Sequence, residues 1–222
     1  DIGGISLIRA AAKNFNDVVI VASKAQYKPF ADILNENGAV TTLAERRWFA
    51  KEAFAVSSHY DSAIFGYFDG EEGSAFRCAV EDQKTLRYGE NPHQRGYFYG
   101  DLNKVFDQIH GKEISYNNLL DINAAIDLID EFDETTFAIL KHNNACGLAS
   151  RETVLEAWKA ALAGDPVSAF GGVLVTNAPI DRATAEEING LFFEVIIAPD
   201  YDVDALQILT QKKNRIILVR KA

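Results

Sequence analysis

Short apolar runs rich in β-branched residues alternate with amphipathic stretches along most of the chain. Runs of this kind are typical of buried strands, and they lie at residues 18–22, 137–140, 173–176, 195–198 and 216–219. Helical patterns lie at residues 7–13, 27–37, 119–132, 154–162, 183–189 and 205–211. Strands that alternate with helices predict an α/β layered fold.

The helix boundaries carry their own signals. Gly38 ends the second helical pattern and Gly164 ends the pattern at residues 154–162. Thr42 and Glu45 have the spacing of a capping box, which opens a long helix toward Phe68. We interpret the aromatic residues of this helix as packing residues, namely Trp48, Phe54, Tyr60, Phe65 and Phe68.

An acidic, glycine-bearing stretch at residues 69–74 indicates a linker between two units. The second α/β series begins after it. We therefore predict one domain over residues 1–75 and another over residues 76–222.

Composition excludes several classes of protein. The net charge of −10, with no basic stripe, argues against a nucleic-acid surface. No apolar run approaches the roughly 20 residues of a membrane helix, and no signal peptide pattern is present. With Cys78 and Cys146 as the 2 cysteines, a disulfide scaffold is excluded and a reducing, cytoplasmic location is expected. The chain has no methionine and opens on Asp1, so we expect a piece of a longer protein.

Two motifs rich in hydrogen-bonding side chains stand where the hydrophobic pattern stops. Residues 87–94 read Arg-Tyr-Gly-Glu-Asn-Pro-His-Gln, and residues 141–147 read Lys-His-Asn-Asn-Ala-Cys-Gly. We expect both to be loops, where binding groups concentrate. Lys141 follows a predicted strand and can hold a phosphate or an oxyanion, while His142 can move protons near neutral pH. Arg87 suits a phosphate through its planar fork of donors.

Each motif also has a purely structural interpretation. Residues 141–147 can be a polar turn closed by Gly147, and residues 87–94 a loop held by its own hydrogen bonds, above all at Asn91 and Gln94. Residues 166–172 form a glycine-rich turn in which Phe170 can stack on a ligand ring, although composition favours a core phenylalanine. Residues 1–4 precede a helix whose free amides can bind an anion, with Lys13 at its end, although an ordinary turn and a surface lysine are favoured.

Taken together, the motifs resemble one family, the bifunctional purine-biosynthesis enzymes that join 5-aminoimidazole-4-carboxamide ribonucleotide (AICAR) transformylase to inosine monophosphate (IMP) cyclohydrolase. The matching segments run in family order along the chain. They lie at residues 1–4, 9–14, 86–94, 116–121, 141–147, 168–172 and 193–199. Ala145 departs from the family pattern, which commonly has proline there.

The resemblance implies the end of a methylglyoxal-synthase-like cyclohydrolase domain, followed by a cytidine-deaminase-like half of the transformylase. It implies formyl transfer from 10-formyltetrahydrofolate to AICAR, then dehydrative closure of formyl-AICAR to IMP. It assigns proton transfer to His142, electrostatic stabilisation to Lys141, and polarisation in the cyclisation to Lys13. It implies that the full-length protein is a homodimer. It assigns substrate binding to ten residues, which are Arg87, Tyr88, Asn118, Ser168, Phe170, Gly171, Glu194, Asp1, Ile2 and Gly3.

Two other hypotheses remain open. The chain can be an inactive nucleotide-binding fragment that lacks the other half of each site. It can also be a metal-dependent, deaminase-like hydrolase, but that signature needs His-x-Glu and Pro-Cys-x-x-Cys. Cys146 stands alone here, followed by Gly147, so we predict no metal.

Overall fold

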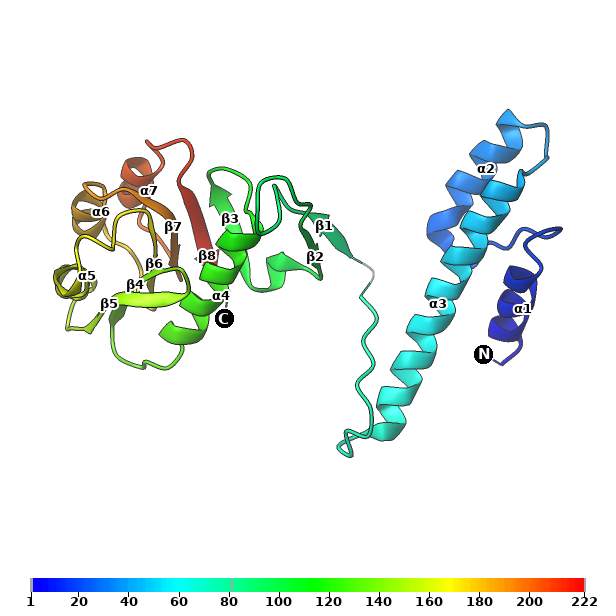
Figure 1. Ribbon diagram of the computed structural model, residues 1–222, viewed down its shortest axis with the longest axis horizontal. Helices are drawn as coiled ribbons and strands as arrows, with labels where there is room; N and C mark the ends of the chain where they lie inside the picture. The colour runs from blue at the N-terminus through cyan, green and yellow to red at the C-terminus, as the bar shows by residue number, and fades with distance from the viewer. Residues whose placement is uncertain (1, 81, 222) are drawn as a thin grey trace. The chain divides into compact units, whose positions relative to one another are not determined.

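The computed structural model describes residues 2–80 and 82–221, and its chain divides into two compact units, Asp1–Glu81 and Asp82–Ala222 (Figure 1). The division lies between Glu81 and Asp82, beyond the end of the long helix, whereas the linker prediction put the domain boundary after residue 75. Each unit is described by itself.

The first unit is helical. It contains α1 (Ile2–Lys13), a short 3-10 helix η1 (Lys24–Gln26), α2 (Tyr27–Glu36) and α3 (Leu43–Asp69). The predicted capping box is confirmed, since the Glu45 amide donates to Thr42 Oγ1 at 3.2 Å and the Thr42 amide donates to Glu45 Oε2 at 2.6 Å. Gly38, with a φ of 62°, follows the end of α2 in the left-handed conformation that glycine favours.

The apolar run at residues 18–22 is not a strand, so that prediction was wrong. It is irregular in structure, and its residues are half-buried or exposed. A strand needs a neighbour to pair its backbone amides and carbonyls, and the described part of this unit offers helices instead. The β-branched composition favoured an extended backbone but cannot supply the missing partner.

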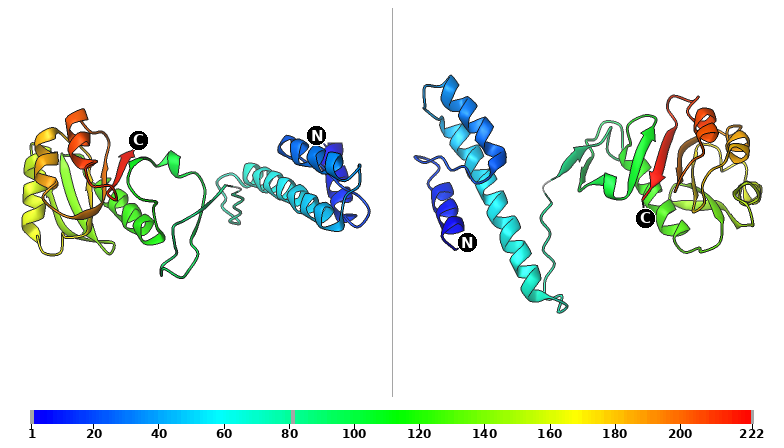
Figure 2. Two further views of the ribbon diagram at one scale, coloured as in Figure 1. Left: turned by 90° about the horizontal axis from the view of Figure 1, so that it is seen from above. Right: turned by 180° about the vertical axis from the view of Figure 1, so that it is seen from behind.

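The core of the first unit is small. Ala12, Ala50 and Ala53 are buried between α1 and α3, while Trp48, Tyr60 and Phe68 are exposed within the unit. The prediction that the α3 aromatics are packing residues was therefore wrong for most of them. α1 and α2 cover only part of the length of α3 (Figure 2).

The second unit has a two-stranded hairpin and a six-stranded mixed sheet. The hairpin joins β1 (Gln83–Thr85) to β2 (Tyr97–Tyr99). The large sheet has the order β3-β8-β7-β6-β4-β5, and the 3-10 helix η2 (Leu102–Lys104) precedes its first strand. Its strands, in chain order, are β3 (Phe106–His110), β4 (Thr136–Lys141), β5 (Asn144–Ser150), β6 (Gly172–Thr176), β7 (Phe193–Ala198) and β8 (Ile216–Arg220).

Helices cover both faces of this sheet (Figure 2). On one face, α5 (Val154–Gly164), α6 (Arg182–Ile188) and α7 (Val203–Leu209) enclose a core that contains Trp158. On the other face, α4 (Tyr116–Ile129) packs its Ile122, Ala125 and Ile129 against the sheet. The predicted α/β layered fold is confirmed. No helix in the ranges that the structure describes has the length and apolar character to cross a membrane.

The predicted strands and helices of this unit are confirmed to within a few residues, but four strands were missed. β1 and β2 are three residues long, and β3 is a largely polar outer strand. β5 begins inside the stretch at residues 141–147 that we expected to be a loop, and it continues to Ser150. Short, polar or small-residue strands lack the apolar alternation that marks a strand in sequence.

Gly147 on β5 stands where the strand meets α5. A Cβ atom at this position would lie 2.0 Å from the carbonyl oxygen of Ala161, which is backbone and cannot move aside freely. Glycine is therefore required by close packing of strand on helix rather than by a turn.

We expect Gly147→Ala to lower the free energy of unfolding by about 1–3 kcal/mol or more, because the added methyl group forces α5 away from the sheet. Gly190→Ala is the matched control, since the nearest atom to its added Cβ would be Glu187 O at 3.5 Å, an ordinary contact. Urea unfolding followed by the fluorescence of the buried Trp158, with Trp48 replaced in every variant, measures both. Equal unfolding midpoints for the two variants would contradict the packing argument.

Candidate functional site

The ends of five neighbouring strands lie in a row at one end of the large sheet, and we call this row of strand ends the sheet edge. Register places the carboxyl end of β4 beside the amino end of β6, with Leu140 opposite Val173. The amino ends of β7 and β8 follow, because β6, β7 and β8 are parallel. β3 returns antiparallel to β8, so its carboxyl end at His110 completes the edge. Lys141 thus lies at a strand's carboxyl end as predicted, but β6, β7 and β8 bring their amino ends to the site.

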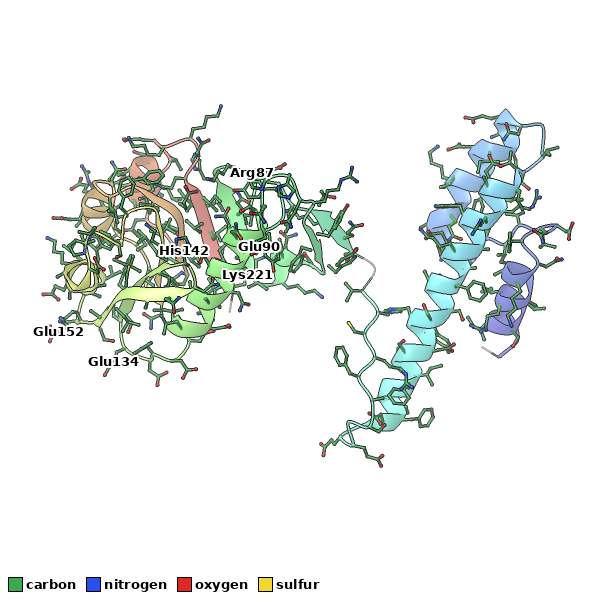
Figure 3. The ribbon with its side chains drawn as sticks, viewed as in Figure 1. Arg87, Glu90, Glu134, His142, Glu152 and Lys221 are labelled. Atoms are coloured by element: carbon green, nitrogen blue, oxygen red, sulfur yellow. The ribbon has the colours of Figure 1, made fainter. Side chains whose placement is uncertain are left out.

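Residues 141–147 are a β-hairpin, so our expectation of a loop there was wrong. Lys141 pairs with Asn144, which leaves His142 and Asn143 as a two-residue turn. Both have positive φ, at 53° and 65°. Such turns match the twist of the flanking strands, but a left-handed backbone costs a non-glycine residue about 1–2 kcal/mol. His142 is thereby displayed at the tip of the hairpin (Figure 3).

Lys141 links the hairpin to the loop before β6. Its Nζ atom donates to the carbonyl oxygen of Phe170 at 2.6 Å, and the side chain remains exposed enough to meet a ligand. Phe170 itself is 59% exposed, and its ring centroid lies 5.1 Å from that of Phe192. The interpretation of Phe170 as a core residue was therefore wrong, and the residue whose carbonyl oxygen binds Lys141 carries an exposed aromatic side chain.

The loop that carries Phe170 is held by Asp165. Its carboxylate accepts from the Ser168 hydroxyl at 2.6 Å and from the Ser168 amide at 2.9 Å. These two bonds, with a third from the Val167 amide, lower the pKa of Asp165 below its ordinary value. Gly171, with a φ of 75°, donates its amide to Phe192 O at 2.7 Å. Ser168 and Gly171 therefore shape the loop in this structure.

Residues 87–94 are anchored to the start of α4. The Tyr116 amide donates to Tyr88 O at 3.3 Å, and Asn117 Nδ2 donates to Glu90 O at 3.0 Å. Arg87, labelled in Figure 3, is exposed. Its guanidinium lies 4.7 Å from the centroid of the Tyr88 ring.

Asn91 and Asn118 of the predicted motifs form hydrogen bonds with residues three positions away in sequence. The Asn91 amide donates to Gln94 Oε1 at 2.8 Å, which confirms the structural interpretation of this pair. Asn118 Oδ1 accepts from the amide and the hydroxyl of Ser115, at 3.2 and 3.0 Å. Its oxygen therefore caps α4 rather than facing a ligand.

A cavity of about 490 Å³ opens farther along the same sheet edge. Glu194 lines it and forms an ion pair with Lys112, which follows β3. Arg215, immediately before β8, is 5% exposed, and its guanidinium stacks 4.2 Å from the Phe193 ring centroid. Burial lowers the pKa of Arg215 from its ordinary value.

Sequence reasoning found Glu194 but missed Lys112, Phe192 and Arg215. Their positions at the ends of β3, β7 and β8 are the signal that could have found them. The cavity lining combines these cations with apolar and aromatic walls, a composition suited to an anionic ligand with a flat ring.

The remaining predicted site residues belong to the first unit. Lys13 is exposed in the last turn of α1, and Gly3 lies in the first turn of that helix, which begins at Ile2. Asp1 and the side chain of Ile2 lie outside the described residues. Among the residues that the structure describes, no three His, Cys, Asp or Glu side chains gather as a metal ion would need.

The second unit is thus a mixed-sheet α/β protein whose edge collects lysine, histidine, arginine and exposed aromatic side chains. Comparison with known proteins gives the family. The model of the AICARFT/IMPCHase bienzyme family matches residues 11–222, and the chain belongs to that family.

Several bacterial proteins, each named bifunctional purine biosynthesis protein PurH, are similar over nearly the whole chain. The one from Bacteroides thetaiotaomicron is 81% identical over 221 residues, which are 100% of this chain and 44% of that protein. Those from Rhodospirillum rubrum and Caldicellulosiruptor saccharolyticus are 48% and 43% identical, over 99% and 98% of this chain and 43% and 45% of their own lengths. The chain therefore spans less than half the length of these relatives.

The hairpin makes a prediction about its cysteine. Desolvation, with a contribution from nearby Asp165, raises the pKa of Cys146, whose Sγ lies 3.5 Å from Ile139 O. The thiolate is the reactive form, so at pH 8 iodoacetamide should modify Cys146 at least about tenfold more slowly than the exposed Cys78. Peptide mass spectrometry over time gives both rates. The two cysteines should react alike in urea, and equal rates in the folded chain would contradict the burial argument.

Proposed function

We propose that this chain forms part of a bifunctional enzyme of purine biosynthesis. The first reaction transfers a formyl group from 10-formyltetrahydrofolate to the 5-amino group of AICAR, and the second closes formyl-AICAR to IMP with loss of water. The observation that carries the proposal is the juxtaposition at the end of β4. There Lys141 reaches Phe170 O and His142 stands exposed at the hairpin tip, in a chain that matches the family from residue 11 to 222.

The chemistry of formyl transfer requires a base and a cation. The amine of AICAR is a poor nucleophile because its lone pair is delocalised into the imidazole and carboxamide. A base must remove a proton as the amine attacks, and a cation must stabilise the oxyanion of the tetrahedral intermediate. We assign removal of the proton to His142 and stabilisation of the oxyanion to Lys141. The Lys141 ammonium already donates to the Phe170 carbonyl oxygen.

The nucleotide would lie along the sheet edge. We assign its flat ring to the exposed face of Phe170 and its phosphate to Arg87, with Tyr88 beside it. The walls of the site would include Gly171, Ser168 and Asn118. We assign them a shaping role, because their polar groups are largely hydrogen-bonded within the protein instead of being available to the nucleotide. Glu194 would accept from sugar hydroxyls once its carboxylate is oriented by Lys112.

A finer assignment rests on the resemblance to the family. We assign residues 1–75 to the end of a methylglyoxal-synthase-like cyclohydrolase domain, and residues 76–222 to the first cytidine-deaminase-like half of the transformylase. Lys13 would polarise the formyl oxygen in the cyclisation, with Asp1, Ile2 and Gly3 next to the nucleotide. Because the chain spans 44% of the Bacteroides relative, the rest of each site would come from the remaining length and from a second copy in a homodimer.

His142→Ala in a protein of the relatives' full length should lower the turnover number for formyl transfer by about 10²–10⁴-fold, because a general base contributes that much. The KM for AICAR should change little, since the imidazole acts on the proton rather than on the phosphate. Steady-state kinetics at saturating 10-formyltetrahydrofolate measures both constants.

His59→Ala is the matched control, because His59 is an exposed histidine on α3. It should retain wild-type turnover. Unchanged turnover in His142→Ala would remove His142 from the role of base.

The alternative function is a nucleotide-binding fragment without activity. Calorimetric titration of the 222-residue chain with AICAR tests it. We expect saturable binding that weakens at least about tenfold in Arg87→Ala, which removes a charge-assisted phosphate contact. Lys104→Ala, which removes a cation from η2, should bind as the wild type does. A folded wild-type chain that binds no AICAR would show that the pocket needs the rest of the enzyme.

A further inference from the structure

The turn that carries His142 needs support from outside the hairpin. Two-residue hairpin turns require positive φ and favour Asn-Gly or Asp-Gly, whereas this one is His-Asn, with φ of 53° and 65°. Left-handed backbone is uncommon for histidine and persists where surrounding structure determines it. The turn has just two residues between paired strands, so a change of its backbone would move the imidazole directly.

Asp121 on α4 supplies that support. Its Oδ1 atom accepts from the backbone amide of Asn143 at 2.9 Å. In a two-residue turn this amide points away from the hairpin and has no partner on the opposite strand. On the other side, Asn144 Nδ2 donates to His142 O at 2.8 Å. The left-handed pair is therefore clamped through its own backbone, once by Asp121 and once by Asn144.

Helix α4 connects this clamp to the second motif. The helix begins at Tyr116, whose amide donates to Tyr88 O, and its first turn is capped by Ser115 and Asn118. Asp121 follows Tyr116 by about one and a half helical turns. One rigid element thus contacts the Arg87–Tyr88 segment at its start and the His142 turn farther along.

We propose that Asp121 is a positioning residue that holds the His142–Asn143 turn in its left-handed conformation, and so fixes the imidazole relative to Lys141 and the Arg87 segment. The proposal rests on the role assigned to His142 above. Asp121 contacts backbone, so it acts through geometry and transfers no proton. Its removal should leave binding of the nucleotide nearly intact while it misplaces the base.

Four variants test this assignment. Asp121→Ala removes the acceptor, whereas Asp121→Asn keeps a side-chain oxygen that can accept from the same amide. Asp121→Ala with Asn143→Gly restores the preference of the turn for positive φ without the clamp. Asp127→Ala is the matched control, because Asp127 lies on the same helix and its side chain accepts from Asn123, within that helix.

Two measurements give the readout. In the 222-residue chain, hydrogen exchange of the Asn143 amide, followed by NMR, should accelerate at least about tenfold in Asp121→Ala and stay near wild type in Asp121→Asn and Asp127→Ala. In a protein of the relatives' full length, Asp121→Ala should lower the turnover number for formyl transfer about ten- to hundredfold, since a misplacement of about 1 Å can cost that much. The KM for AICAR should stay within about threefold, and Asn143→Gly should restore most of the turnover.

The outcomes separate this proposal from the proposed function. Unchanged exchange of the Asn143 amide in Asp121→Ala would overturn the clamp, and unchanged turnover in an active protein would overturn the positioning role. A double variant as slow as Asp121→Ala alone would show that Asp121 does not act through the turn. A wild-type protein without formyl transfer would refute the proposed function instead, and the exchange comparison would still decide whether Asp121 holds the turn.

Discussion

Burial of the central strands on both faces is the constraint on which the second unit depends. β4, β6 and β7 are buried almost end to end, between α4 on one side and α5, α6 and α7 on the other. Charged groups cannot lie on such faces without a large desolvation cost. Polar chemistry is therefore driven to the strand ends, where Lys141, Glu194 and Arg215 are found.

The mixed direction of the sheet then decides which residues meet. β4 runs opposite to β6, so the last residue of β4 and the residues before β6 and β7 share one edge. If β4 and β6 were parallel, Lys141 and Phe170 would lie at opposite ends of the sheet. The contact of Lys141 Nζ with Phe170 O is thus a direct result of this reversal.

The sequence predicted the second unit well because its buried strands are continuous apolar runs with helices between them. It failed at β5, whose residues are mostly small or polar and form a strand because they continue from β4 through a two-residue turn. It failed at residues 18–22 for the opposite reason, since a β-branched run without a pairing partner stays irregular. Local pattern reports what a segment prefers, whereas pairing depends on what the rest of the chain provides.

The residue types of the candidate site could be predicted from the sequence. We did not predict which of their polar atoms are already hydrogen-bonded within the protein. Lys141, His142, Arg87 and Phe170 are exposed or reach the sheet edge, as their chemistry suggested. Asn118 and Ser168 looked equally suited to a ligand, but their polar atoms are taken by Ser115 and Asp165. Both pairs are three residues apart, the spacing of a local side-chain cap, so the sequence carried a signal for these hydrogen bonds that our interpretation of the motifs as ligand contacts left unused.

β5 also has a consequence for how copies of the chain meet in solution. It is the outer strand of the sheet beyond β4, so one row of its backbone amides and carbonyls faces away from any neighbour within the sheet. Edges of this kind are templates for aggregation when they are long, flat and rich in β-branched or aromatic residues. This strand reads Asn-Ala-Cys-Gly-Leu-Ala-Ser, and its register with β4 shifts between Ile139 and Leu140. The same small residues that let α5 approach closely thus make the unpaired side of β5 a poor template for another strand. The sheet can end at β5 without recruiting another copy of the chain.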